Sequence, residues 1–159
     1  QKFTIGAAYH HVANKTAMRS HTVDGPHKPY GADSMNIWTV GTGYRFDKNV
    51  ALSGAYAKNT QGDVESKLRT AWSAELDYKG ADPADQGSWG AYLAYRHLGD
   101  YGIMFPTYNA IFTGQKGWQL GVRATVLKNV VATFEYFDGK DISTDLKQNT
   151  VFARVEAFF

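Results

Sequence analysis

The segment NTVFARVEAFF, residues 149–159, alternates between apolar and polar side chains. One set of alternate positions is wholly apolar and consists of Val151, Ala153, Val155, Ala157 and Phe159. The other set carries two charges, Arg154 and Glu156. Because successive side chains of a β-strand point to opposite faces, the segment predicts a strand with one apolar and one charged face. Transmembrane barrel strands of about 9–11 residues have this pattern with aromatic residues at their ends, and an edge strand of a soluble all-β domain shares the alternation.

The same alternation recurs along the rest of the chain. It occupies residues 2–11, 36–46, 50–58, 68–79, 89–96, 118–126 and 130–137. Most apolar sets begin or end with Trp, Tyr or Phe, whereas the opposite sets hold Gly, Ala, Ser and Thr with occasional charges. No segment has a convincing helical period. The sequence therefore predicts an all-β fold of about eight strands, arranged as an antiparallel transmembrane outer-membrane β-barrel.

The predicted connections alternate in length. Residues 47–49 and 128–129 form short turns, and residues 80–87 form a moderate one, whereas the connections after the first, third, fifth and seventh strands are longer. Outer-membrane barrels have short periplasmic turns and longer loops outside the cell. A soluble sandwich has no reason to sort its loops in this way, so the lengths favour the barrel.

The composition argues against several classes of function. A chain of 159 residues is long enough for one domain, taken here as residues 1–159. It has no cysteine, a net charge of only +2 and no run of 18 apolar residues, which argues against thiol chemistry, a nucleic-acid partner and a transmembrane helix. No catalytic or metal-ligating constellation stands out. We therefore expect no enzymatic activity, no metal site and no cofactor.

Residues 87–141 and the segment VFARVEAFF resemble the C-terminal part of S-layer-homology porins of the OmpM type. The most specific matches are AYRHLG, PTYNA, KGWQLG, the Lys-Asn turn before VVATFEYFDGKD, and FARVEAFF; the first 85 residues resemble the family in style only. The resemblance implies a trimeric barrel of about sixteen strands and an N-terminal domain that binds peptidoglycan. On this basis the chain is expected to be the C-terminal half of a larger barrel, and a complete eight-stranded barrel is the alternative.

The function predicted from these features is a porin of the bacterial outer membrane. It would let small hydrophilic solutes and ions diffuse passively, and its partners would be outer-membrane lipid, two further copies in a homotrimer, and peptidoglycan through a domain outside this chain. The alternative is a structural barrel or anchor protein that does not conduct.

Charged side chains on the polar sets are the candidate pore-lining residues. A charge facing lipid at the midplane costs about 2–4 kcal/mol, so these side chains are expected to face inward. They are Arg45, Glu75, Asp77, Arg96, Arg123, Glu135, Arg154 and Glu156. The same parity adds Arg69 and Lys79, so that inward cations outnumber acids by six to four and a weak anion preference is expected. In a small barrel the same charges would instead pair in a packed interior.

Neighbouring strands also suggest a specific pairing. Glu135 lies on the strand between those of Arg123 and Arg154. Opposite charges facing each other on adjacent strands attract, so Glu135 is expected to hold one or both arginines.

Residues 99–117 form an unusual loop. It carries a set of large side chains and a proline: Ile103, Met104, Phe105, Pro106, Tyr108, Ile111 and Phe112. Burying each large apolar side chain contributes roughly 1.5–3 kcal/mol, so the set is not expected to stay in water. The loop is predicted to fold into the lumen as a constriction. The alternatives are a latch onto a neighbouring subunit, and a short strand or helical turn packed on the rim.

Overall fold

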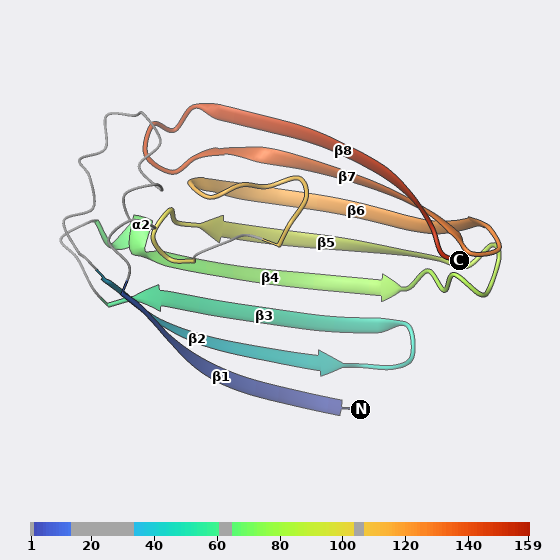
Figure 1. The fold of residues 1–159 in the computed structure, drawn as a ribbon, viewed down its shortest axis with the longest axis horizontal. Coiled ribbons are helices and arrows are strands. Elements are labelled where there is room, and N and C mark those ends of the chain that lie inside the picture. The colour runs from blue at the N-terminus through green and yellow to red at the C-terminus, as the bar shows by residue number, and fades with distance from the viewer. Residues whose placement is uncertain (1, 14–33, 61–64, 104–106) are drawn as a thin grey trace.

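The computed structural model describes residues 2–13, 34–60, 65–103 and 107–159 of the chain. Within them, eight antiparallel strands form one sheet, in the order in which they occur in the sequence (Figure 1). The strands are β1 (Lys2–Ala13), β2 (Ser34–Arg45), β3 (Val50–Asn59), β4 (Thr70–Lys79), β5 (Trp89–Leu98), β6 (Gln115–Leu127), β7 (Val130–Asp141) and β8 (Lys147–Ala157). The prediction of an all-β fold with eight antiparallel strands is confirmed. The sheet is not closed, because β1 and β8 are not paired with each other.

The strand register keeps apolar and polar side chains on opposite faces. On one face Leu52, Leu76, Leu93 and Leu120 are direct partners across β3 to β6, and each is nearly half exposed. On the other face Asp77, Tyr92, Gly121 and Glu135 are partners across β4 to β7. We call the face with the leucines the outer face and the face with Glu135 the inner face. The outer face is a broad exposed apolar surface.

Side-chain hydrogen bonds and a left-handed backbone conformation explain the short turns. The Asp47 side chain accepts hydrogen bonds from the backbone N–H groups of Asn49 and Val50, at 2.6 and 2.9 Å, which fixes the β2–β3 turn. Asn129, in the two-residue β6–β7 turn, has a φ of 61°, a left-handed conformation that asparagine tolerates better than most residues. Both turns lie at the same end of the sheet as the start of β1 and the end of β8, and the strand ends that the longer connections join lie at the opposite end (Figure 1).

Two predictions fail at the ends of β4. The strand was expected to start at residue 68, but the structure has one helical turn there, α2 (Ser66–Arg69), which buries Leu68; Arg69 therefore does not belong to the inward row of a strand. At the other end Lys79 has a φ of 55°. This turn of the backbone carries its ammonium to within 5.4 and 5.2 Å of the ring centres of Tyr78 and Trp89, which are residues of the outer face. The inward placement of Lys79 is wrong for that reason.

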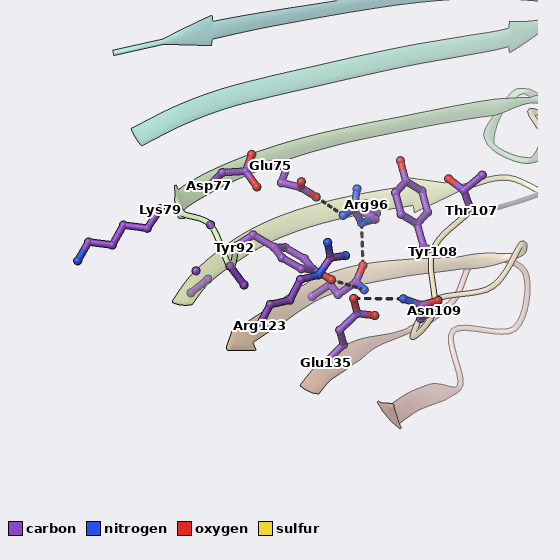
Figure 2. A pocket seen from close by; sticks show the side chains of 15 residues that line it. Glu75, Asp77, Lys79, Tyr92, Arg96, Thr107, Tyr108, Asn109, Arg123 and Glu135 are labelled. Atoms are coloured by element: carbon purple, nitrogen blue, oxygen red, sulfur yellow. Dashed lines mark hydrogen bonds and ion pairs between the residues drawn. The ribbon is translucent and has the colours of Figure 1, made fainter. Parts of the chain in front are cut away.

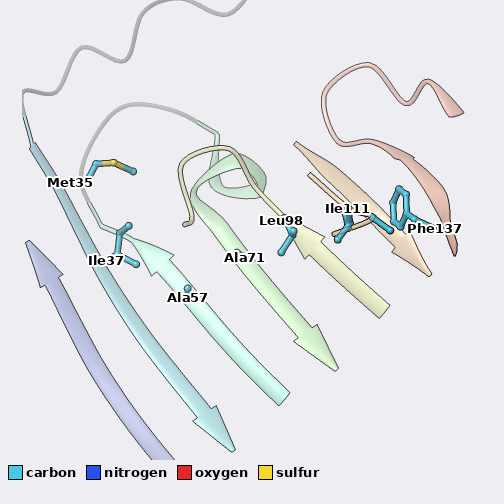
Figure 3. Packing of buried hydrophobic residues seen from close by; sticks show 8 residues of the cluster. Met35, Ile37, Ala57, Ala71, Leu98, Ile111 and Phe137 are labelled. Atoms are coloured by element: carbon cyan, nitrogen blue, oxygen red, sulfur yellow. The ribbon is translucent and has the colours of Figure 1, made fainter. Parts of the chain in front are cut away.

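The main apolar cluster lies between the inner face and the β5–β6 connection, residues 99–114 (Figure 3). Its buried members are Met35, Ile37, Ala57, Ala71, Leu98, Ala110, Ile111 and Phe137. Ile103 and Tyr108 pack against the cluster. The described residues of the connection, 99–103 and 107–114, are therefore folded onto the inner face of the sheet. No helix within the described ranges is long and apolar enough to cross a membrane.

Candidate functional site

The inner face of β4 to β7 and the β5–β6 connection enclose a polar cavity of about 380 Å³ (Figure 2). Its charged and polar lining comes from Glu75, Asp77, Lys79, Tyr92, Arg96, Thr107, Tyr108, Asn109, Gln119, Arg123 and Glu135. Neighbouring strands supply alternate residues to this face, so the cavity wall follows directly from the period of two in the sequence.

Arg96 is the centre of the hydrogen-bond network. Its side chain is only 3% exposed. The guanidinium donates to Gln119 Oε1 at 2.8 Å and to Ser73 Oγ at 2.6 Å, and it forms an ion pair with Glu75. Charge-assisted bonds of this kind are about twice as strong as neutral ones, so Arg96 joins β4, β5 and β6 firmly.

The position of the Tyr92 ring depends on the absence of a side chain on the next strand. It lies opposite Gly121, where a Cβ would lie 2.0 Å from the Tyr92 ring. The glycine leaves room for the ring to lie against β6. In that position the hydroxyl of Tyr92 accepts a hydrogen bond from Gln119 Nε2 at 2.9 Å, and the network of Arg96 continues toward Glu135.

The β5–β6 connection supplies two side chains to the site. The Arg96 guanidinium carbon lies 3.8 Å from the ring centre of Tyr108, a favourable cation–π contact. Asn109 Nδ2 donates to Glu135 Oε1 at 3.3 Å. Figure 2 shows both residues facing the strands across the cavity. These contacts hold the connection against the charged wall.

Backbone contacts fix the start of the same connection. Tyr101 N–H donates to the carbonyl of Leu68 at 2.8 Å. A Cβ at Gly102 would lie 2.7 Å from the backbone nitrogen of Ala71, so the chain passes β4 at a distance that only glycine allows. Burial raises the pKa of the Tyr101 hydroxyl, and the neighbouring Asp100 adds to the effect.

Glu135 is the least satisfied polar residue of the site. Its side chain is 2% exposed, and Oε2 has no hydrogen-bond partner. The expected pairing with arginines is wrong, because the register places Thr133 opposite both Arg123 and Arg154. Arg154 instead pairs with Glu156 at 3.0 Å. The Asn109 amide donates to the other carboxylate oxygen, Oε1.

The candidate pore-lining residues fall into two groups. Glu75, Asp77, Arg96, Arg123 and Glu135 line the cavity. The others lie away from it, with Arg45 exposed at the end of β2, and Arg154 and Glu156 on β8. A position on the inner face is therefore not enough to bring the eight charged residues together at one site.

The large side chains of the predicted constriction loop also lie in different environments. Tyr108 lines the cavity, Ile103 and Ile111 belong to the apolar cluster, and Phe112 is 54% exposed. Met104, Phe105 and Pro106 lie outside the described residues. The predicted inward folding therefore agrees with the position of Tyr108 and Ile111, whereas a role as a constriction stays a prediction.

No protein-family model matches this chain, and no curated protein matches its sequence. The resemblance to S-layer-homology porins therefore stays an expectation.

Sequence reasoning missed four residues of the network: Ser73, Tyr92, Asn109 and Gln119. The alternation of the sequence places Ser73, Tyr92 and Gln119 on the inner face, but uncharged side chains carried no signal for a pore lining. Asn109 had no such signal, because its position depends on how the connection packs. No group of three or more metal-ligating side chains is close enough to hold a metal ion within the described ranges.

Proposed function

We propose that the chain forms part of the wall of a transmembrane β-barrel in the bacterial outer membrane, and that the barrel is a porin for small hydrophilic solutes and ions. The observation that carries this proposal is the contrast between the two faces of the sheet. The exposed face carries leucine, valine and aromatic side chains, whereas buried positions of the other face hold Arg96, Gln119 and Glu135. A water-soluble domain has the opposite arrangement.

Lipid is the partner that fits the outer face. Exposed apolar patches of a soluble monomer rarely exceed a few hundred Å², yet here the apolar rows run across the whole sheet. Trp38, Trp72, Tyr78, Trp89 and Trp118 stand at the ends of these rows. Aromatic girdles at both membrane interfaces flank the apolar band of known barrels.

The open edges support a wall that is completed by further strands. β1 and β8 each present unpaired backbone groups, which are costly in a membrane. Further strands of a larger barrel would pair with both edges. The homotrimer and the attachment to peptidoglycan are proposed on the sequence resemblance alone.

The β5–β6 connection is proposed to narrow the channel. It lies on the inner face and its Tyr108 and Asn109 contact charged residues of the wall. A segment in this position reduces the free cross-section of a barrel. The charges around the cavity would then act on solutes at close range.

Conductance in planar bilayers tests the proposal. The full-length protein, folded and reconstituted, is expected to form channels with stepwise currents that scale with salt concentration. A protein that inserts into vesicles yet carries no current would instead be a structural barrel or anchor. A protein that remains soluble without detergent would contradict the membrane assignment as well.

A further inference from the structure

Acidic groups outnumber the cationic groups that point into the cavity. Three carboxylates, Glu75, Asp77 and Glu135, line it together with two guanidinium groups, Arg96 and Arg123. Lys79 also belongs to the lining, but its ammonium points away from the cavity and lies over the outer-face rings of Tyr78 and Trp89. The groups that point into the cavity therefore include one more negative than positive group.

Two of the three carboxylates are not neutralised by an ion pair. Glu75 is neutralised by Arg96, since the two form an ion pair. Asp77 and Glu135 have no ion pair within the described ranges, and they lie on either side of Tyr92 and Gly121 in one row of the sheet. Figure 2 shows both carboxylates at the cavity.

Glu135 also has an acceptor that the protein leaves unused. Oε2 is buried without a hydrogen-bond partner, and an unsatisfied buried acceptor costs about 1–3 kcal/mol, more when it is charged. The terminal torsion of a glutamate side chain is soft, so a donor in the cavity can draw this oxygen toward it. A group that brings both a positive charge and N–H donors would satisfy Glu135 best.

We infer that the cavity binds the primary ammonium group of a small organic solute, with Glu135 as its acceptor and Asp77 as a further negative charge in the lining. The inference rests on the proposed function and specifies the solute class of that pore. An ammonium has three donors and no acceptor, which suits the Glu135 carboxylate and the hydroxyl of Tyr92. A volume of about 380 Å³ is within the range of small-molecule sites. At this site cations are favoured, contrary to the weak anion preference expected from the sequence.

Two probe ions of equal charge test the role of the N–H donors. n-Butylammonium carries three N–H groups and tetramethylammonium carries none. Each is added to the full-length protein in a planar bilayer in potassium chloride, and the concentration that halves the single-channel current is measured. Butylammonium is expected to block at a lower concentration. Equal block by the two ions would overturn the hydrogen-bonded site.

Matched substitutions test whether Glu135 is the acceptor of the ammonium. Glu135→Gln removes the charge at nearly constant shape and is expected to weaken butylammonium block roughly fivefold, the effect of one charge pair at about 4 Å in water. Glu156→Gln is the control, because Glu156 is an inner-face acid on β8 that does not line the cavity. Unchanged block in Glu135→Gln, or an equal loss in both variants, would overturn the assignment.

Two further measurements distinguish failure of the ammonium site from failure of a variant to fold and from failure of the porin proposal. If Glu135→Gln does not fold, Asp77→Asn replaces it with the same expected direction. If the wild-type protein forms no channels, the porin proposal fails, and isothermal titration of butylammonium and tetramethylammonium into the detergent-solubilised protein then tests the site by itself. Binding of butylammonium that Glu135→Gln weakens supports the site, and absence of binding overturns it.

Discussion

Arg96 illustrates how one residue joins several parts of the site. It is buried, it contacts Ser73, Glu75 and Gln119 through its guanidinium, and Tyr108 covers it. Only arginine has a planar fork of five donors that meets acceptors in three directions. A lysine keeps the charge but presents a compact ammonium.

Arg96→Lys is therefore expected to lower the free energy of unfolding by roughly 2–4 kcal/mol, because at least one charge-assisted bond and a buried acceptor are lost. Urea unfolding of the vesicle-bound protein, followed by tryptophan fluorescence, measures the change. Arg154→Lys is the matched control. Its pair with Glu156 is partly exposed, so a change below about 1 kcal/mol is expected. Equal changes in the free energy of unfolding would show that the network around Arg96 contributes no more to stability than the exposed pair of Arg154 does.

Gly121 has a role that only its missing side chain explains. A methyl group there would meet the Tyr92 ring at 2.0 Å. Gly121→Ala is expected to displace the ring, to break its bond with Gln119 and to destabilise the protein by about 1–3 kcal/mol, as overpacking usually does. Thermal unfolding followed by circular dichroism measures the loss.

The double variant Gly121→Ala/Tyr92→Ala gives the decisive comparison. If the cost comes from the clash, adding Gly121→Ala to Tyr92→Ala should cost much less than adding it to the wild type. Equal costs in the two backgrounds would mean that Gly121 is needed for its backbone and not for the space beside it.

The strands were largely predictable because their signal is local. The period of two placed Glu75, Asp77, Arg96, Arg123 and Glu135 on the same face as the structure does. That parity fails where the backbone leaves the extended conformation. Lys79 is the example, since a φ of 55° turns its side chain to the other face.

The cavity could not be predicted in the same way, because it depends on contacts between distant segments. The bond from Asn109 to Glu135 needs the β5–β6 connection to fold back over β7. The apolar content of the connection indicated burial, but it did not indicate which residues would face charges. Ile111 and Phe112 are neighbours in sequence and have opposite environments.

This difference between Ile111 and Phe112 provides a test of the whole connection. Ile111 is 0% exposed in the apolar cluster, and Phe112 is 54% exposed. Ile111→Asp would bury an unpaired charge, which is strongly unfavourable, so the connection should detach from the inner face. Single-channel conductance is expected to rise, while Phe112→Asp leaves it unchanged.

The same pair distinguishes the constriction from a latch. If residues 99–114 held neighbouring subunits together, the exposed Phe112 would be the contact. Phe112→Asp would then dissociate the oligomer on native gels, and Ile111→Asp would leave conductance unchanged. That pattern would contradict the constriction.

At the scale of the whole molecule, depth along the outer face separates a membrane wall from a soluble sheet. Leu93 lies in the middle of β5 and Val126 lies near the end of β6. In lipid, Leu93→Arg should cost about 2–4 kcal/mol and Val126→Arg about 0–1 kcal/mol. Unfolding titrations of both variants in vesicles measure the difference. Two small, equal costs would indicate that water, not lipid, contacts the outer face.

Each strand pairs only with its neighbours in sequence, and this has a consequence for how such a wall can evolve. All residues around the cavity lie between Glu75 and Glu135. A hairpin gained or lost at either edge changes the circumference, which grows roughly linearly with strand number, and leaves every pairing around Arg96 as it was. The diameter of the enclosing barrel and the chemistry of its narrowest wall can therefore diverge independently.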